Sequence, residues 1–269
     1  MQKITRALLL TTLVCAAAPA LAADAPAAAA PAPDFALTAN VGLYSQYVFR
    51  GIAQSGEKPA VQGGMDLTHS SGFYAGFWGS NVSWLEDYQG YSTGSLELDL
   101  YGGYRGTIGD TGLSYNVGAL RYQYPGSRPA GIANANTTEL YGSLGWKWFT
   151  LKYSQSVGAE TFGFANSRNT SYIDLSAALP VADTGLTLGA HYGKQHYKGD
   201  VGGVSNDQFS YEDWKVSATY DLGKLSAVTA NTTVGIAYTD TNAKRAVYTD
   251  TNNKFMGASQ TTVWIARTF

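Results

Sequence analysis

The sequence predicts an all-β protein, a transmembrane antiparallel up-and-down β-barrel of about twelve strands. Between Phe35 and Phe269, segments of roughly ten residues alternate apolar and polar side chains, as strands of such barrels do. The connections between these segments alternate between short and long. Aromatic side chains recur near the ends of the segments, where they are expected to form interfacial girdles.

The clearest strand is predicted over residues 95–106. Leu98 and Leu100 lie on one face of this segment and Glu97 and Asp99 on the other, so one face suits lipid and the other water. A single strand of this kind would also suit a soluble sandwich, and the prediction therefore depends on the whole series. The same alternation is found at residues 37–44, 61–68, 139–146 and 172–179.

The connections predict which ends of the strands lie together. Short turns at one rim and long polar loops at the other are typical of outer-membrane barrels, with the turns periplasmic and the loops extracellular. Most of the short segments carry Gly, Asp or Ser, as turns require. The turns are expected at residues 69–72, 107–112, 147–148, 181–185 and 222–226, and the loops at 54–58 (the shortest), 83–94, 126–136, 158–169, 198–210 and 241–258.

This arrangement places lipid-facing aromatic residues at both rims, as an interfacial girdle requires. The periplasmic girdle is expected to contain Phe73, Tyr104, Trp146, Phe149, Tyr220 and Phe269, and the outer girdle Tyr153, Tyr192, Trp214 and Tyr238.

The N-terminal residues predict export from the cytoplasm. Lys3 and Arg6 precede an apolar run, and Ala20-Leu21-Ala22 is a small-x-small cleavage site, so residues 1–22 are expected to be a signal peptide. An Ala- and Pro-rich leader follows at residues 23–34, and residues 35–269 form the predicted barrel domain. The chain's one cysteine, Cys15, lies in the signal peptide, which leaves no thiol or disulfide chemistry for the mature chain.

Composition excludes several classes of partner. The formal net charge is -2, and it becomes two units more negative once Lys3 and Arg6 are removed, which argues against nucleic acid binding. Apart from the signal peptide, no stretch approaches the eighteen or so consecutive apolar residues that a membrane helix needs. A membrane span must therefore be made of strands.

Charged residues of both signs occupy the inward positions, where they would be costly against lipid but useful in water. One interpretation is a narrow, selective pore, and the other is that these charges pair across the lumen and fill it. Arg121 is ambiguous, because its neighbours permit either an outward position or a bulge. The expected pore-lining residues are Asp66, Glu97, Asp99, Arg105, Glu139, Lys152, Asp174, Asp213 and Lys215.

An enzyme is the second hypothesis, because residues 90–94 match the G-x-S-x-G pattern around Ser92. The motif lies in a long loop, and His69 is expected at the opposite rim, so no serine–histidine pair is expected. His191 and His196 are predicted on opposite strand faces, which argues against a shared metal. We therefore expect no catalytic residue, no enzyme activity and no metal ligand.

The loop at residues 241–258 and the sequence before it repeat Tyr-Thr-Asp-Thr-Asn, at residues 238–242 and 248–252. The oxygens of this repeat could hold calcium, but the Gly and Glu spacing of a calcium loop is absent. A solvated loop is expected instead. A third hypothesis makes the long loops an adhesin or receptor surface on a closed barrel.

Several segments resemble the TorF-type porin family of bacterial outer membranes. The most specific is SQYVFRGI at residues 45–52, followed by KPAVQGG at 58–64 and GFYAGFWGSNV at 72–82. Residues 97–104, 122–126, 138–141 and 211–216 continue the resemblance along nearly the whole mature chain. The resemblance implies an outer-membrane barrel and brings no catalytic or ligand residues with it.

The C-terminal residues partly match the sorting signal of such barrels, because Val263, Ile265 and Phe269 alternate while Arg267 interrupts them and would have to snorkel. We expect a bacterial outer-membrane channel for passive diffusion of small polar solutes or ions, with no cofactor. Its expected partners are outer-membrane lipids, the barrel-assembly machinery and the permeating solutes. The alternatives are a closed adhesin or receptor barrel and an outer-membrane hydrolase.

Overall fold

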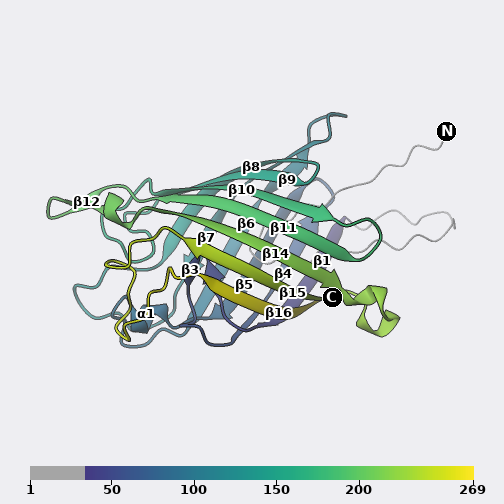
Figure 1. Cartoon of the computed structure of the whole chain (residues 1–269). Coiled ribbons are helices and arrows are strands. Elements are labelled where there is room, and N and C mark those ends of the chain that lie inside the picture. Colours follow the sequence, from purple (N-terminus) through teal and green to yellow (C-terminus); the bar gives the residue numbers. More distant parts are fainter. Residues whose placement is uncertain (1–33) are drawn as a thin grey trace, which may run out of the picture.

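The computed structural model describes residues 34–269, and within them twelve antiparallel strands form a closed barrel (Figure 1). Strand β1 closes the barrel by pairing with β4 on one side and with β16 on the other. The predicted all-β barrel is confirmed. The predicted signal peptide at residues 1–22 and all of the leader except Asp34 lie outside the described residues.

The barrel strands match the predicted segments closely, because the alternation that predicts each strand also fixes which of its faces points inward. Every neighbouring pair is antiparallel, as short sequential connections require. The strands are β1 (Phe35–Tyr44), β4 (Ala60–His69), β5 (Phe73–Asn81), β6 (Leu96–Thr107), β7 (Leu113–Gln123), β8 (Thr137–Trp146), β9 (Phe149–Ser156), β10 (Ser171–Pro180), β11 (Leu186–His196), β14 (Tyr211–Asp221), β15 (Thr232–Thr241) and β16 (Gln260–Thr268).

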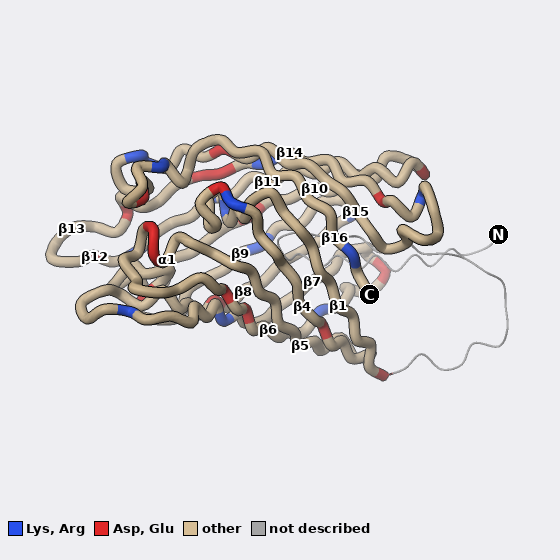
Figure 2. The backbone as a smooth tube through the Cα atoms, turned by 90° about the horizontal axis from the view of Figure 1, so that it is seen from below, with Lys and Arg blue, Asp and Glu red and all other residues tan. Residues whose placement is uncertain are grey.

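Burial in the barrel is the reverse of that in a soluble protein, because apolar side chains face outward and charged side chains face inward. On β6, Leu98 and Leu100 are exposed on the outside, whereas Glu97 and Asp99 are buried inside. Aliphatic side chains are exposed in the same way around the whole barrel, and Figure 2 shows long stretches of strand without a charged residue. An apolar surface of this extent matches the lipid-facing band of a transmembrane barrel.

The two ends of the barrel differ (Figure 1). At the end that carries the C-terminus, which we call the turn end, most connections are short; the loops gather at the other end, the loop end. The predicted tight turn at 222–226 is wrong, since this connection runs from residue 222 to 231 through the 3-10 turns η2 (Leu222–Lys224) and η3 (Ala227–Thr229). Asp221 and Ser226 cap these turns by accepting backbone hydrogen bonds, which delays the start of β15.

Aromatic rings lie on the outer surface near both ends, as predicted. Phe73 packs on Tyr104 at the turn end, with ring centroids 4.9 Å apart. Trp214 packs on Tyr238 nearer the loop end, at 5.6 Å. Arg267 faces outward at the turn end and its guanidinium lies 5.5 Å from the centre of the Phe269 ring, which is how an arginine is tolerated at a membrane interface.

The loops carry the remaining elements. Hairpin β2 (Val48–Phe49) and β3 (Ile52–Ala53) lies between β1 and β4, α1 (Trp84–Asp87) between β5 and β6, and β12 (Asp200–Val201), β13 (Val204–Ser205) and η1 (Asn206–Phe209) between β11 and β14. Among the described residues, no helix is long and apolar enough to span a membrane.

The connection from β1 to β4, which we call loop 1, spans residues 45–59. The prediction of a short loop at 54–58 is therefore wrong. The apolar run of Tyr47, Val48 and Phe49 suggests a continuing strand, but the chain leaves the barrel wall after Tyr44 to form the β2–β3 hairpin.

Candidate functional site: the barrel lumen

Loop 1 contains a tight hairpin. Val48 pairs with Ala53 and Phe49 with Ile52, which leaves two residues to make the turn. These are Arg50 and Gly51, whose φ angles are 46° and 78°. Positive φ at both central residues is the requirement of a type I′ hairpin turn, and the glycine meets it without strain.

The hairpin lies inside the barrel, across the half nearer the loop end, which we call the outer half. On one side the Tyr47 hydroxyl donates to Glu97 of β6 at 3.0 Å. On the other side Gly51 lies against the wall so closely that a Cβ at this position would be 2.7 Å from Cβ of Asp213 on β14 and 2.3 Å from Cγ2 of Thr241 on β15. Loop 1 therefore spans the lumen from one wall to the other.

Arg50 at the hairpin tip is held by the opposite wall. Its Nη2 lies 2.7 Å from Glu139 Oε2, and its Nη1 donates to Glu139 Oε1 at 3.0 Å and to Gln195 Oε1 at 2.9 Å. The guanidinium also lies 4.2 Å from the centre of the Tyr172 ring and 4.8 Å from that of Phe49. Bidentate and cation–π contacts of this kind suit arginine and could not be reproduced by lysine.

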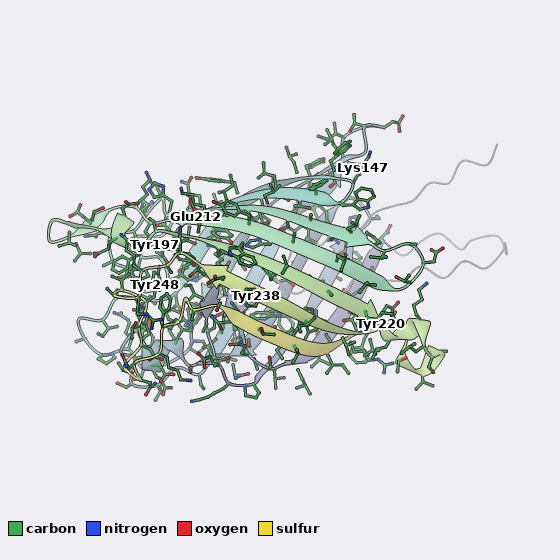
Figure 3. The ribbon with its side chains drawn as sticks, viewed as in Figure 1. Lys147, Tyr197, Glu212, Tyr220, Tyr238 and Tyr248 are labelled. Carbon is green, nitrogen blue, oxygen red and sulfur yellow. The ribbon has the colours of Figure 1, made fainter. Side chains whose placement is uncertain are left out.

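Aromatic side chains from the loops cover the hairpin at the loop end. Tyr88 and Tyr248 stack with an interplanar angle of 7°, and burial raises the pKa of the Tyr88 hydroxyl to about 12. A cavity of about 40 Å³ between these side chains and the hairpin has space for a few water molecules. Figure 3 shows Tyr197 and Tyr248 at this end, opposite Lys147 and Tyr220.

The loop with the repeated Tyr-Thr-Asp-Thr-Asn motif is less solvated than expected. Tyr248 is buried and its hydroxyl donates to the carbonyl of Phe209 at 2.6 Å. Asp250 accepts backbone hydrogen bonds from Asn252 and Lys254, so its carboxylate shapes the loop.

A histidine joins two carboxylates in the middle of the lumen. His191 Nδ1 lies 2.5 Å from Asp174 Oδ2, and Nε2 lies 2.7 Å from Asp213 Oδ2. The Tyr172 hydroxyl donates to the other oxygen of Asp213 at 2.8 Å. Each ring nitrogen faces a carboxylate, an arrangement that imidazolium satisfies with two donated hydrogen bonds. Lys215 is the register partner of His191 on β14.

Closer to the turn end the lumen is lined by tyrosines and by charged residues of both signs. Asp66 accepts a hydrogen bond from the Tyr101 hydroxyl at 2.7 Å. Arg105 donates to Thr68 at 2.9 Å, and the Lys152 ammonium lies 4.4 Å from the centre of the Tyr141 ring. These side chains are partly exposed, in contrast to the packed outer half.

The nine residues predicted to line a pore all occupy inward positions. They form separate small groups and not one continuous ring. Asp174 and Asp213 meet at His191, and Glu139 meets Arg50. Glu97 and Asp99 are the buried neighbours on β6. Asp66, Arg105, Lys152 and Lys215 have the contacts described above and no ion pair among residues 34–269.

Sequence reasoning missed the loop residue Arg50 and the partners Gln195 and Tyr172. Gly51 directly after Arg50 is the one signal that could have suggested a turn inside the apolar run. For His191 the sequence predicts only a strand face opposite to that of His196, and it gives no sign of the two carboxylate partners.

Arg121 lies outside the barrel. Strand β7 pairs with β6 and β8 without interruption, and Leu120 and Tyr122 on either side of Arg121 point inward, so there is no bulge in this strand. The guanidinium donates to Thr138 at 2.9 Å and to Gln123 at 3.4 Å near the loop end.

The serine and histidines of the enzyme hypothesis lie apart. Ser92 is exposed in the loop before β6, where its backbone nitrogen donates to Ser127, and His69 contacts Ser71 at the turn end. His196 faces outward, 3.6 Å from Asp207, while His191 points inward. Among the described residues, no group of three or more His, Cys, Asp or Glu is arranged to hold a metal ion.

The family described as "Bacterial protein of unknown function (Gcw_chp)" matches residues 28–269. No curated protein matches the chain. Among solved structures, the chain is similar to an outer membrane channel from Pseudomonas putida, with 14% identity, a TM-score of 0.50, and 91% of this chain and 99% of that chain covered. At this identity the likeness shows the barrel fold.

Two other solved structures resemble the chain at slightly lower scores. A NanC porin is 12% identical with a TM-score of 0.49, covering 87% of this chain and 99% of that chain. A KdgM porin is 8% identical with a TM-score of 0.49, covering 86% and 98% respectively.

Proposed function

We propose that this chain, which belongs to the Gcw_chp family of bacterial proteins, is an outer-membrane channel for passive diffusion of small polar solutes or ions. In this arrangement the turn end faces the periplasm and the loop end faces the outside, as in other barrels of this kind. Loop 1 limits the size of what passes, because it crosses the lumen in its outer half.

One observation carries the proposal: the closed barrel is apolar outside and polar inside. Charged groups such as Asp174, His191 and Lys215 lie inside a wall whose outer face is aliphatic. Partly exposed charged side chains suit a lumen through which water and ions pass.

Loop 1 is the element that sets the width of the passage. The β2–β3 hairpin contacts both walls, and aromatic side chains pack above it around a cavity of about 40 Å³. We therefore expect small ions to pass beside the hairpin and larger solutes to require its displacement.

Other features belong to the same proposal. The resemblance to TorF-type porins is in keeping with an outer-membrane barrel, and residues 1–22 are proposed as the signal peptide that brings the chain to the periplasm. Insertion then depends on the barrel-assembly machinery and on outer-membrane lipids. The nine inward residues predicted from the sequence are proposed to line the path.

A second candidate is a closed barrel that acts through its outer loops. The packing of Tyr47, Ile52 and Tyr248 in the outer lumen favours it, because all three are buried. This candidate predicts a folded barrel that passes nothing.

Solute uptake into proteoliposomes tests the proposed function. Liposomes containing the folded barrel should swell in isotonic solutions of small polar solutes, with a rate that falls steeply as solute size increases. Liposomes with heat-unfolded protein serve as the control. Equal swelling in both preparations would favour the closed barrel over the channel.

A further inference from the structure

We propose that Glu97 and Asp99 form a cation site in the lumen wall, which takes a small inorganic cation such as K⁺, Na⁺ or Ca²⁺. The inference rests on the proposed function, because a conducting lumen would bring the cation to the site. It goes further by naming the charge of the preferred solute and the residues that bind it.

Buried acidic side chains outnumber buried basic ones in the outer half of the lumen. Glu97, Asp99 and Glu139 are buried there, with 1%, 5% and 2% relative exposure. Arg50 uses both terminal nitrogens on Glu139 and Gln195. Within residues 34–269, no lysine, arginine or histidine forms an ion pair with Glu97 or Asp99. A carboxylate that is buried without an ion-pair partner is costly, so it takes up either a proton or a cation from solution.

Two buried side-chain oxygens on the inner wall of the barrel lack a hydrogen-bond partner. Asp99 Oδ1 and Gln62 Oε1 have no hydrogen-bond partner and almost no contact with solvent. Both side chains belong to residues that are at least nine-tenths buried. Unpaired buried acceptors of this kind indicate a missing ligand or water, because native proteins rarely leave such atoms unsatisfied.

These groups lie on three neighbouring strands. Gln62 on β4 is opposite Ser80 on β5, and Ser80 is opposite Glu97 on β6. Asp99 lies two residues further along the inward face of β6, roughly 7 Å from Glu97 along the strand. The register therefore places two carboxylates, an amide oxygen and a hydroxyl at neighbouring inward positions of three adjacent strands.

The chemistry of this patch points to a hard cation. All four side chains offer oxygen, the ligand atom that alkali and alkaline-earth ions prefer, and none offers sulfur or imidazole nitrogen. Glu97 also accepts from the Tyr47 hydroxyl at 3.0 Å, so loop 1 covers the site. Two carboxylates are too few for a tight structural metal site, and they suit an ion that enters and leaves.

A thermal unfolding experiment tests the site directly. The detergent-purified barrel should unfold at a higher temperature in KCl or CaCl₂ than in N-methylglucamine chloride of equal ionic strength. The double variant Glu97→Gln, Asp99→Asn should lose this difference while remaining folded. The control variant Glu212→Gln, Asp240→Asn removes two charges from the loop end of strands β14 and β15 and should keep it. Equal unfolding temperatures of the unmodified protein in all three salts would overturn the site.

A reversal potential separates this inference from the proposed function. In a KCl gradient the channel should favour K⁺ over Cl⁻, and Glu97→Gln, Asp99→Asn should lower that ratio by about threefold or more. A conducting channel whose ratio is unchanged by the double variant would overturn the site and leave the channel intact. A silent barrel that still shows cation-dependent unfolding would support the site and contradict the channel.

Discussion

The Arg50 guanidinium meets the Glu139 carboxylate at 2.7 Å inside the barrel, and this pair ties loop 1 to strand β8. Both side chains are buried, and two parallel hydrogen bonds join them. Removing one member of such a pair destabilises the fold, because the charge that remains is buried without a partner. This pair therefore helps to hold loop 1 in the lumen, together with the hydrogen bond from Tyr47 to Glu97.

Replacing Arg50 by Ala should release the hairpin. The change leaves Glu139 buried without a counter-charge and should destabilise the folded barrel by about 3–5 kcal/mol. Urea unfolding in lipid or detergent measures this loss. The double variant Arg50→Ala, Glu139→Gln should recover part of the stability, since it removes the unpaired charge. A double variant as unstable as Arg50→Ala alone would contradict the role assigned to the pair.

Replacing Gly51 by Ala should also displace loop 1, for a different reason. Gly51 has a positive φ, and an added Cβ would collide with Thr241 and Asp213. Limited proteolysis from the outside should therefore cut loop 1 faster in the variant. Gly131→Ala is the matched control, because Gly131 has a φ of 86° but open space around it. If both variants were cut alike at loop 1, the steric contact inside the barrel would be refuted.

Replacing Leu175 by Arg should impair folding into membranes. Leu175 is exposed near the middle of β10, where a charge facing lipid costs about 2–4 kcal/mol. Val228→Arg is the control, because Val228 is an aliphatic residue that is even more exposed than Leu175 (81% against 50%) but lies in η3, outside the barrel strands. The yield of heat-modifiable barrel from refolding into liposomes measures both. Equal yields would argue against the outer surface of the barrel being a lipid-facing band.

Replacing His191 by Gln should alter both stability and ion preference. Asp174 and Asp213 would lose their shared partner, which should destabilise the barrel by about 3 kcal/mol and make the lumen more favourable to cations. Urea unfolding and reversal potentials measure the two effects. His196→Gln should change neither, because His196 faces outward and lies 3.6 Å from an exposed Asp207. If the two variants behaved alike in both measurements, the contacts of His191 with Asp174 and Asp213 would not have the role proposed for them.

The barrel could be predicted from the sequence because each strand is recognised from the alternation of residues within it. Alternation along a strand fixes which side chain faces inward, so Glu97, Asp99 and Glu139 were placed correctly from their immediate neighbours. The same reasoning left Arg121 undecided, because its neighbours suit either parity and only the pairing with β6 and β8 settles its outward position.

The contents of the lumen could not be predicted in the same way. Arg50 meets Glu139 across a sequence distance that no local pattern encodes, and the chain's turn into the barrel depends on Arg50 and Gly51 adopting positive φ. His191 joins Asp174 and Asp213 from three strands for the same reason. The sequence identifies the charged residues, and only the closed barrel decides which of them pair.

Single-channel recording in a planar bilayer tests the central claim most directly, with the unmodified barrel and the Arg50→Ala variant compared in the same salt. We expect discrete conductance steps for the unmodified protein and larger steps for the variant, because loop 1 then no longer crosses the lumen. Folded protein that gives no steps in either form would contradict a channel narrowed by loop 1.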